Sequence, residues 1–245
     1  MRKIVRYPLG KTELKYLVKR QGDADSKLGR DELIVDRHWS SSIQARAMRK
    51  IRTVLGQMAG SLESCMYCSH SHGSDIDHFW PKRQYHAKMY DWMNYLLCCT
   101  ECGRIKGVKF PLDPLGNPLL INPSVLDPWE HLDFDPSTGN ITSRYITPSS
   151  TFSLLGDETV KALELDQREA LSKAYQLAYS RIVDCIREYL GSTKNEEDRT
   201  KFSHTLGIIE DKGLLGWTRT SSTSKMQPFQ DLRKDALGWS TLQSI

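Results

Sequence analysis

The sequence predicts an α+β protein in which a small zinc-bound core lies between helical N-terminal and C-terminal regions. Two Cys-x-x-Cys pairs, Cys65/Cys68 and Cys99/Cys102, bracket a segment that contains aspartate, histidine and asparagine. Apolar residues recur at helical spacing on both sides of this segment, over residues 42–58 and 166–191. The stretch after Pro111 is instead rich in Pro, Gly, Asn and Asp, which favour turns and permit only short strands.

Length and composition are those of a folded globular protein. With 245 residues, of which 39% are hydrophobic and 26% charged, the chain is long enough for one large or two small domains. We divide it into a basic helical N-terminal region (1–60), a core with both cysteine pairs (61–112), a turn-rich extension (113–156) and a helical C-terminal region (157–245). The last region is expected to dock a partner.

The N-terminal region contains one clear helical pattern. Apolar residues recur every three or four positions over residues 42–58, which predicts an amphipathic helix that Gly60 ends. The apolar stripe consists of Ile43, Ala47, Ile51, Val54, Leu55 and Met58. Residues 20–30 are rich in Lys, Arg, Gly and Asp without a period, which predicts a loop or a partly ordered segment.

The second half of the chain begins with turns and ends with helices. A short strand is expected at residues 119–121, and helix from near Asp157. Residues 166–169, Asp-Gln-Arg-Glu, are typical of a capping box that opens a long helix ending at Gly191. Its apolar stripe is Leu171, Ala174, Leu177, Ala178, Ile182, Cys185 and Tyr189, so Cys185 is expected to be buried. Residues 192–200 predict a polar linker, and residues 226–245 one more short helix.

Charge and cysteine usage bound the class of protein. No stretch approaches the roughly 20 apolar residues of a membrane span, and the first residues lack the apolar core of a signal peptide, which favours the cytoplasm. Five of the six cysteines lie between residues 65 and 102, a spacing typical of metal ligands and not of disulfides. Basic residues outnumber acidic ones in residues 1–60, and the reverse holds in residues 113–245. The basic part suits contacts with phosphates, or is only a solvated face.

The two cysteine pairs predict a structural zinc site. Pairs with two intervening residues can together supply the four thiolates of a tetrahedral site, whose metal bonds contribute folding energy to a small core. The expected ligands are Cys65, Cys68, Cys99 and Cys102. Cys98 adjoins Cys99, but the two-residue spacing to Cys102 favours Cys99; His70 and His72 are alternative ligands, and buried thiols or a redox pair are the alternative to zinc.

An Asp-His dipeptide lies in the loop between the two cysteine pairs. A carboxylate such as Asp77 can hold a divalent ion, Mg²⁺ or Mn²⁺, and a neutral imidazole such as His78 can take a proton from water near pH 7. Because the cysteine pairs would fix both ends of this loop, the two side chains are expected to be positioned for metal-dependent hydrolysis.

Basic and aromatic residues surround this dipeptide. Lys82, Arg83, Lys106 and Lys109 are candidates for binding the phosphates of a nucleic acid, and the alternative is that they are ordinary surface residues. The aromatic residues could stack on bases, but a small core also needs aromatic packing, which is the preferred interpretation for Trp92. His131 lies outside the motif and is expected to be structural.

Together these residues resemble the HNH, or ββα-metal, nucleases. His78 precedes Asn94 by sixteen residues, and position 103 follows Asn94 by nine, which is similar to the spacing of that family. The resemblance implies a ββα-metal (HNH) nuclease core, in which a hairpin and a helix surround one catalytic divalent ion. It implies that His78 is the general base, that Asp77 is a ligand of Mg²⁺ or Mn²⁺, and that Asn94 orients the hairpin.

The sequence departs from that family at its last motif position. The family has His or Asn there, as a metal ligand, and this chain has Gly103. Waters around a Mg²⁺ held by Asp77 could compensate, or Asp75, His86 or Glu101 could replace the ligand. The alternative function is a weakened or inactive HNH-fold zinc module that binds nucleic acid or a partner.

A longer string of residues is similar to the HNH nuclease subunit of Septu antiphage systems and its retron-associated relatives. It comprises residues 77–82, 90–97, 102, 106–107, 110–111, 119–123, 128–132 and 139–141, and the opening of the helix at residues 163–165. The resemblance implies antiviral defence, a partner ATPase of the ABC/SMC type, and DNA or tRNA as the nucleic acid that is cut.

Overall fold

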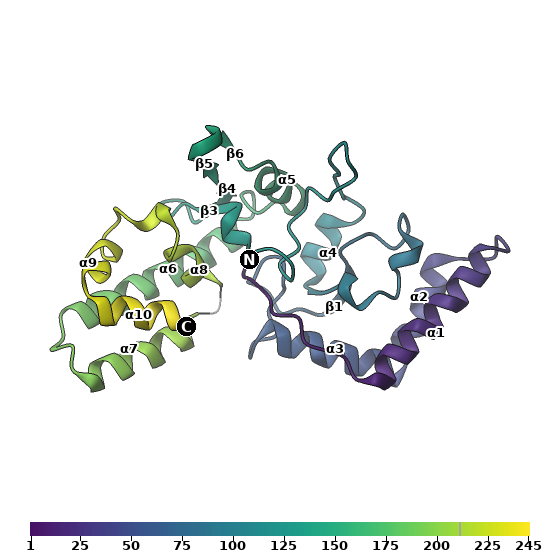
Figure 1. Ribbon diagram of the computed structural model, residues 1–245, viewed down its shortest axis with the longest axis horizontal. Coiled ribbons are helices and arrows are strands. Elements are labelled where there is room, and N and C mark those ends of the chain that lie inside the picture. Colours follow the sequence, from purple (N-terminus) through teal and green to yellow (C-terminus); the bar gives the residue numbers. More distant parts are fainter. Residues whose placement is uncertain (211) are drawn as a thin grey trace.

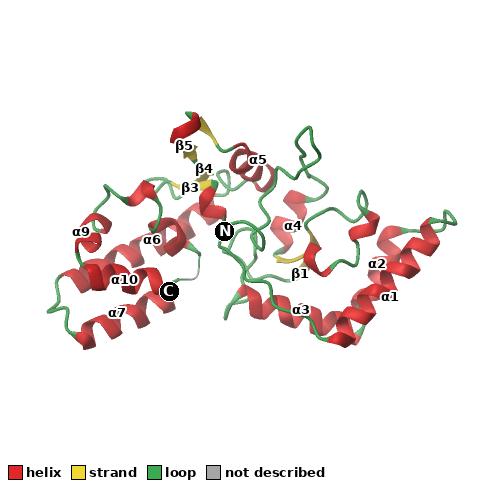
Figure 2. Cartoon of the chain, viewed as in Figure 1, coloured by secondary structure: helices red, strands yellow, loops and turns green. Residues whose placement is uncertain are grey.

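The computed structural model describes residues 1–210 and 212–245. The molecule is elongated, with helices α1 to α3 on one side, helices α6 to α10 gathered at the opposite end, and a small hairpin with helix α4 between them (Figure 1). Helices dominate, and the strands that the structure describes are short (Figure 2). The α+β class predicted from the sequence agrees with this architecture.

Three helices form the N-terminal region: α1 (Lys11–Leu28), α2 (Val35–Ile43) and α3 (Arg46–Ala59). The loop predicted at residues 20–30 is wrong up to residue 28, because α1 continues to Leu28 and buries Ala24. The predicted helix over residues 42–58 is divided at Gln44 and Ala45, the cap residues of α2 and α3. It ends as expected at Gly60, whose φ of 89° favours glycine.

The core contains a β-hairpin followed by a helix. Strand β1 (Asp75–His78) pairs antiparallel with β2 (Tyr95–Cys98), and His78 lies opposite Tyr95. Two short 3-10 helices, η1 (His86–Lys88) and η2 (Trp92–Asn94), lie in the long connection between the strands. Helix α4 (Thr100–Lys106) begins directly after β2. Because the strands are antiparallel, the start of β1 and the end of β2 lie beside the start of α4, and His78 at the end of β1 lies near Lys106 at the end of this helix.

The following segment forms small hairpins. Strand β3 (Leu132–Phe134) pairs with β4 (Ile141–Ser143), and β5 (Tyr145–Ile146) with β6 (Thr151–Phe152); η3 (Pro128–Glu130) and η4 (Thr147–Ser149) are 3-10 helices. The predicted strand at residues 119–121 is wrong. Ile121 is buried, but its amide donates to the Thr159 hydroxyl at 2.8 Å and so satisfies its hydrogen bond outside a sheet.

The C-terminal region consists of α5 (Leu154–Leu163), α6 (Glu169–Leu190), α7 (Glu196–Ile209), α8 (Leu214–Thr218), η5 (Ser221–Thr223), α9 (Phe229–Lys234) and α10 (Ala236–Ser244). The predicted linker at residues 192–200 instead contains the start of α7, where Asn195 and Asp198 form a capping box. The single helix predicted at residues 226–245 is two, since Asp235 caps α10. Cys185 is buried as expected.

The predicted capping box at residues 166–169 is also wrong. Arg168 occupies the N-cap position of α6, and no side chain caps this helix end. Its guanidinium instead reaches back to α4, where it contacts Glu101 and Cys102. A contact between distant elements therefore replaces the local one that the sequence pattern favours.

One hydrophobic cluster runs through the molecule and includes the cysteine pairs, the β1–β2 hairpin and the inner faces of α3 and α6. Trp92 is buried in it, as the sequence predicted. Among the described residues, none of the helices combines the length and apolar character that crossing a membrane would require.

Candidate active site and metal centre

Four cysteines from two segments meet beneath the hairpin. Cys65 and Cys68 lie in the loop before β1, and Cys99 and Cys102 lie at the start of α4. Their sulfur atoms are all within 4.8 Å of one another, and those of Cys68 and Cys99 are 3.9 Å apart. Zinc–sulfur bonds of about 2.3 Å in a tetrahedron place sulfur atoms about 3.8 Å apart. The cluster therefore fits a tetrahedral ion, and it uses Cys99 and not Cys98.

The four thiols differ in how readily they lose a proton. Hydrogen bonds from Cys102 and Cys65 lower the pKa of the Cys99 thiol to about 7, and the same partners lower the pKa of Cys68 below its ordinary value. Burial raises the pKa of the Cys65 thiol, and the pKa of Cys102 is raised as well. The Arg168 guanidinium donates to the Cys102 sulfur at 3.2 Å. A cation that donates to a coordinating sulfur stabilises its negative charge.

The His78 side chain is buried at the end of β1, with 4% of the residue exposed. Its Nε2 lies 2.9 Å from the Met89 carbonyl oxygen. A carbonyl oxygen only accepts, so Nε2 carries the proton and Nδ1 carries the lone pair of the neutral ring. Burial lowers the pKa of His78 to about 4. At neutral pH the ring is therefore an unprotonated base of fixed tautomer.

Aromatic rings hold this imidazole in place. The ring of Trp39 from α2 lies 4.4 Å from it, and that of Tyr95 on the paired strand 5.3 Å from it, both edge to face. Such contacts restrict the ring orientation. Trp39 is a contributor that the sequence did not indicate, because it is distant in sequence and no pattern marks it.

Asn94 fixes the backbone around His78 through three hydrogen bonds. Its Oδ1 accepts from the Trp80 amide at 2.7 Å, and its Nδ2 donates to the carbonyls of Trp80 at 3.0 Å and of Lys88 at 2.8 Å. Trp80 follows His78 by two residues, and Lys88 directly precedes Met89. Asn94 thus ties the strand that carries the imidazole to the loop whose carbonyl orients it.

An open cavity of about 310 Å³ adjoins the hairpin. The residues that line it include Asp77, His78, Lys82 and Arg83. Two glycines line it as well: Gly103, in the middle of α4, and Gly107, which directly follows this helix. Lys82 lies 3.3 Å from Asp36 of α2, and the Arg83 Nε donates to the same carboxylate at 2.9 Å. The cavity therefore presents a base, a carboxylate and two cations.

The Asp77 carboxylate already has two partners. Its Oδ2 accepts from the Tyr67 hydroxyl at 2.7 Å and lies 3.0 Å from the Lys106 ammonium, which also donates to the His78 carbonyl at 2.8 Å. Gly103 contributes no ligand, and in the described part of the chain the cysteine cluster is the one group of three or more candidate ligands. These residues do not fit a divalent ion well, because a cation already occupies the vicinity of the carboxylate.

The predicted phosphate-binding residues have separate locations. Lys82 and Arg83 line the cavity. Lys106 is fully buried and contacts Asp77 and the His78 carbonyl, so its ammonium does not face the solvent, where a phosphate would bind. Lys109 lies outside the cavity and pairs with Glu164 at 3.3 Å. His131 hydrogen-bonds to the Ser153 hydroxyl at 3.0 Å, which agrees with a structural role.

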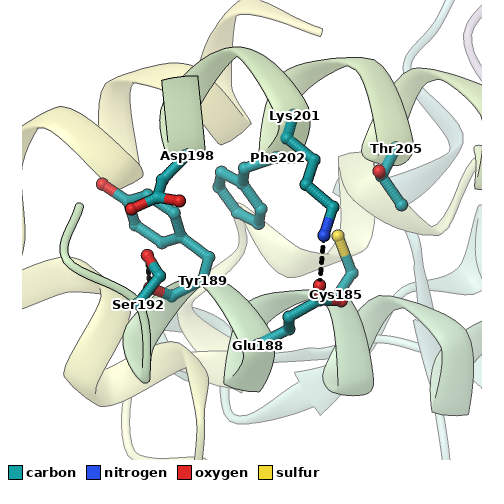
Figure 3. A pocket seen from close by; sticks show the side chains of 8 residues that line it. All are labelled: Cys185, Glu188, Tyr189, Ser192, Asp198, Lys201, Phe202 and Thr205. Atoms are coloured by element: carbon teal, nitrogen blue, oxygen red, sulfur yellow. Dashed lines mark hydrogen bonds and ion pairs between the residues drawn. The ribbon is translucent and has the colours of Figure 1, made fainter. Parts of the chain in front are cut away.

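A second, smaller cavity of about 40 Å³ lies between α6 and α7 (Figure 3). Cys185, Tyr189 and Phe202 are among the residues that line it. The Lys201 ammonium spans the gap to Glu188 at 2.6 Å, and the rings of Tyr189 and Phe202 stack at 4.4 Å. These contacts join the two helices to each other and leave no set of converging groups for chemistry.

Comparisons of the chain with protein-family models, with curated proteins and with solved structures find no match.

Proposed function

We propose that this protein is an endonuclease that hydrolyses phosphodiester bonds of nucleic acid, with a hairpin-and-helix core of the HNH kind. The observation that carries the proposal is the state of His78: a buried, neutral imidazole, fixed by the Met89 carbonyl, at a cavity that Lys82 and Arg83 also line. The combination suits an anionic substrate that is attacked by water.

The proposed reaction assigns one task to each group. His78 Nδ1 takes a proton from a water molecule, whose oxygen attacks the phosphorus. The bond from phosphorus to the leaving oxygen breaks, and that oxygen takes a proton from solvent. Lys82 and Arg83 offset the charge that develops on the non-bridging oxygens. Asn94 holds the backbone around His78 through its hydrogen bonds to Trp80 and Lys88, and so keeps the imidazole at the cavity.

Zinc at the four cysteines has a structural part in this proposal. The site has four protein ligands and therefore no open position for a substrate or water. The sequence also predicts a catalytic Mg²⁺ or Mn²⁺ at Asp77. Because the residues around Asp77 do not fit such an ion well, no step of the proposed reaction passes through it.

The resemblance to the nuclease subunits of Septu and retron-associated systems supplies the proposed biological role. On that basis the protein would act in antiviral defence with an ATPase of the ABC/SMC type. The helices α6 to α10 form a separate end of the molecule (Figure 1), which is a suitable place for such a partner to dock.

A cleavage assay tests the proposed activity. The purified chain is incubated with plasmid DNA and with total tRNA, with and without the partner ATPase, beside His78→Ala and the control His204→Ala. His204 is exposed on α7, remote in sequence from the cavity residues. We expect cleavage by the wild type and by His204→Ala, and a loss of at least about 100-fold in His78→Ala, the usual contribution of a general base. Equal cleavage by all three proteins would contradict the assignment.

A zinc module that binds nucleic acid without cutting it is the second candidate. Gly103 supplies no ligand, and Asp77 is paired with Lys106, which together favour this alternative. It predicts that the wild type binds nucleic acid, cuts none under any of these conditions, and binds equally well after His78→Ala.

A further inference from the structure

The positive charge beside the Asp77 carboxylate is the ammonium of Lys106 and not a metal ion. Lys106 lies one helical turn after Gly103 on α4, so the two positions share a face of the helix. The side chain of Lys106 is 0% exposed, and its ammonium contacts Asp77 Oδ2 and the His78 carbonyl at 3.0 and 2.8 Å. A buried ammonium thus lies next to the Asp77 carboxylate, where the resemblance to the HNH nucleases implies a divalent metal ion.

This placement conflicts with a divalent ion at the same carboxylate. Magnesium binds carboxylate oxygens at about 2.0–2.1 Å. An ion at Asp77 Oδ2 would then lie within about 5 Å of the ammonium, and the two like charges would repel each other in a partly buried place. The other contact of Oδ2, the Tyr67 hydroxyl at 2.7 Å, uses a further lone pair of this oxygen.

The neighbouring carboxylate offers no substitute. Asp75 is two residues before Asp77 on β1 and so shares its face of the strand. Its Oδ2 is hydrogen-bonded by the Ser74 hydroxyl at 2.6 Å and lies 3.3 Å from that of Thr100. Asp75 is not among the residues that line the cavity, so Asp77 is the carboxylate that remains there, and it lies beside the Lys106 ammonium.

We infer that the Lys106 ammonium takes the place of a divalent ion at Asp77. Lys106 is a positioning residue: it neutralises Asp77 and holds the carbonyl of His78, so the strand that carries the base is fixed without a metal. Where this inference concerns cleavage, it rests on the proposed nuclease function. It makes the nuclease independent of Mg²⁺ and Mn²⁺, with zinc at the cysteines as its single metal requirement.

Metal binding by the zinc-loaded wild type is the first test, because it requires neither activity nor a variant. Mn²⁺ is titrated against the protein and followed by electron paramagnetic resonance. We expect no saturable site below millimolar Mn²⁺. One Mn²⁺ bound per chain at micromolar concentration, and lost in Asp77→Asn, would overturn the inference.

A variant that removes the ammonium provides the positive control. In Lys106→Met, which keeps an unbranched apolar side chain and removes the ammonium, Asp77 loses its cation and Mn²⁺ affinity should rise at least tenfold. The double variant Asp77→Asn, Lys106→Met should lose this gain. Unchanged Mn²⁺ affinity in a folded, zinc-loaded Lys106→Met protein would contradict the inference; if that variant does not fold, the wild-type titration decides alone.

Cleavage in buffer freed of divalent ions separates this inference from the function on which it rests. With one zinc per chain verified, we expect wild-type cleavage to change less than twofold when Mg²⁺ or Mn²⁺ is added. Cleavage that appears only after the addition would overturn the inference and leave the nuclease intact. If no cleavage occurs in any buffer, the nuclease function fails, whereas the Mn²⁺ titration still decides the role of Lys106.

Discussion

The His78 imidazole donates from Nε2 to the Met89 carbonyl at 2.9 Å. This bond joins the end of β1 to the loop before β2 and determines which ring nitrogen carries the proton. It also keeps the ring inside the protein, where burial lowers the pKa of His78 to about 4. The contact with the Met89 carbonyl therefore fixes the tautomer, whereas burial keeps the ring uncharged, because the contact by itself raises the pKa of His78.

This burial predicts a dependence of stability on pH. The pKa of His78 is about 4 in the folded state, against about 6.5 in an unfolded chain. Protonation therefore favours unfolding: the stability is full above about pH 6.5 and falls as the pH decreases toward 4. The expected loss is on the order of 3 kcal/mol.

Denaturant unfolding of the wild type and of His78→Gln at pH 7 and pH 4.5 measures this loss. Glutamine can still donate to the Met89 carbonyl but does not titrate, so the variant should lose less stability between the two pH values. The idea fails if both proteins lose the same amount.

Local patterns predicted the metal cluster, and long-range packing produced the rest of the site. The spacing within each cysteine pair involves only four consecutive residues. The sequence was therefore enough to choose Cys99 and not Cys98 as the partner of Cys102. Trp39, Tyr67 and Arg168 depend on how α2, the first cysteine loop and α6 pack against the hairpin and α4. Nothing in their neighbours in the sequence marks them.

The same contrast explains the errors in the fold. Residues 20–30 lack an apolar stripe because the small Ala24 is the single residue that α1 buries there. The capping box predicted at residues 166–169 is absent because Arg168 contacts the cysteine cluster. In both cases tertiary contacts outweighed the secondary structure that the local sequence favours.

Asn94→Ala should damage both stability and cleavage. The variant leaves the Trp80 amide and the carbonyls of Trp80 and Lys88 without their partner, and each lost bond costs about 1 kcal/mol or more. We expect about 2–4 kcal/mol of destabilisation by chemical denaturation and a reduced cleavage rate. Asn94→Asp keeps the acceptor for Trp80 and loses both donors, so it should be no more stable than the wild type and should also cut poorly. Full activity in Asn94→Ala would refute a role in orienting the hairpin.

Zinc removal should unfold the core. Cys68→Ser loses one of four ligands, and small metal-bound cores depend on the metal for folding. Metal analysis should give one zinc per chain for the wild type and none for Cys68→Ser. Thermal unfolding of Cys68→Ser should show a broad transition at a lower temperature than that of the wild type. Cys185→Ser is the matched control, since Cys185 is buried but outside the cluster; it should keep its zinc. A folded, zinc-loaded Cys68→Ser protein would remove the structural role of the site.

Arg168 should control how firmly zinc is held. Its guanidinium donates to the Cys102 sulfur, and partners of this kind typically change metal affinity by about 10–100-fold. In Arg168→Gln we therefore expect zinc to transfer at least about tenfold faster to a colorimetric chelator. Arg187→Gln, on the exposed face of the same helix, is the control and should behave like the wild type. Equal release rates in the two variants would show that the contact does not influence the metal.

Lys82 should contribute to nucleic-acid binding, and Lys109 should not. Lys82 lines the cavity beside His78, whereas Lys109 lies outside it. Each is paired with one carboxylate, Lys82 with Asp36 and Lys109 with Glu164, so the difference between them is their location. A lysine that contacts one phosphate releases about one counterion on binding, so the slope of log affinity against log salt should decrease by about 0.9 in Lys82→Gln. Fluorescence anisotropy with a labelled oligonucleotide at several salt concentrations measures this slope, and Lys109→Gln should match the wild type. The same decrease in both variants would mean that the cavity is not where the phosphates bind and that the lysines act only through net charge.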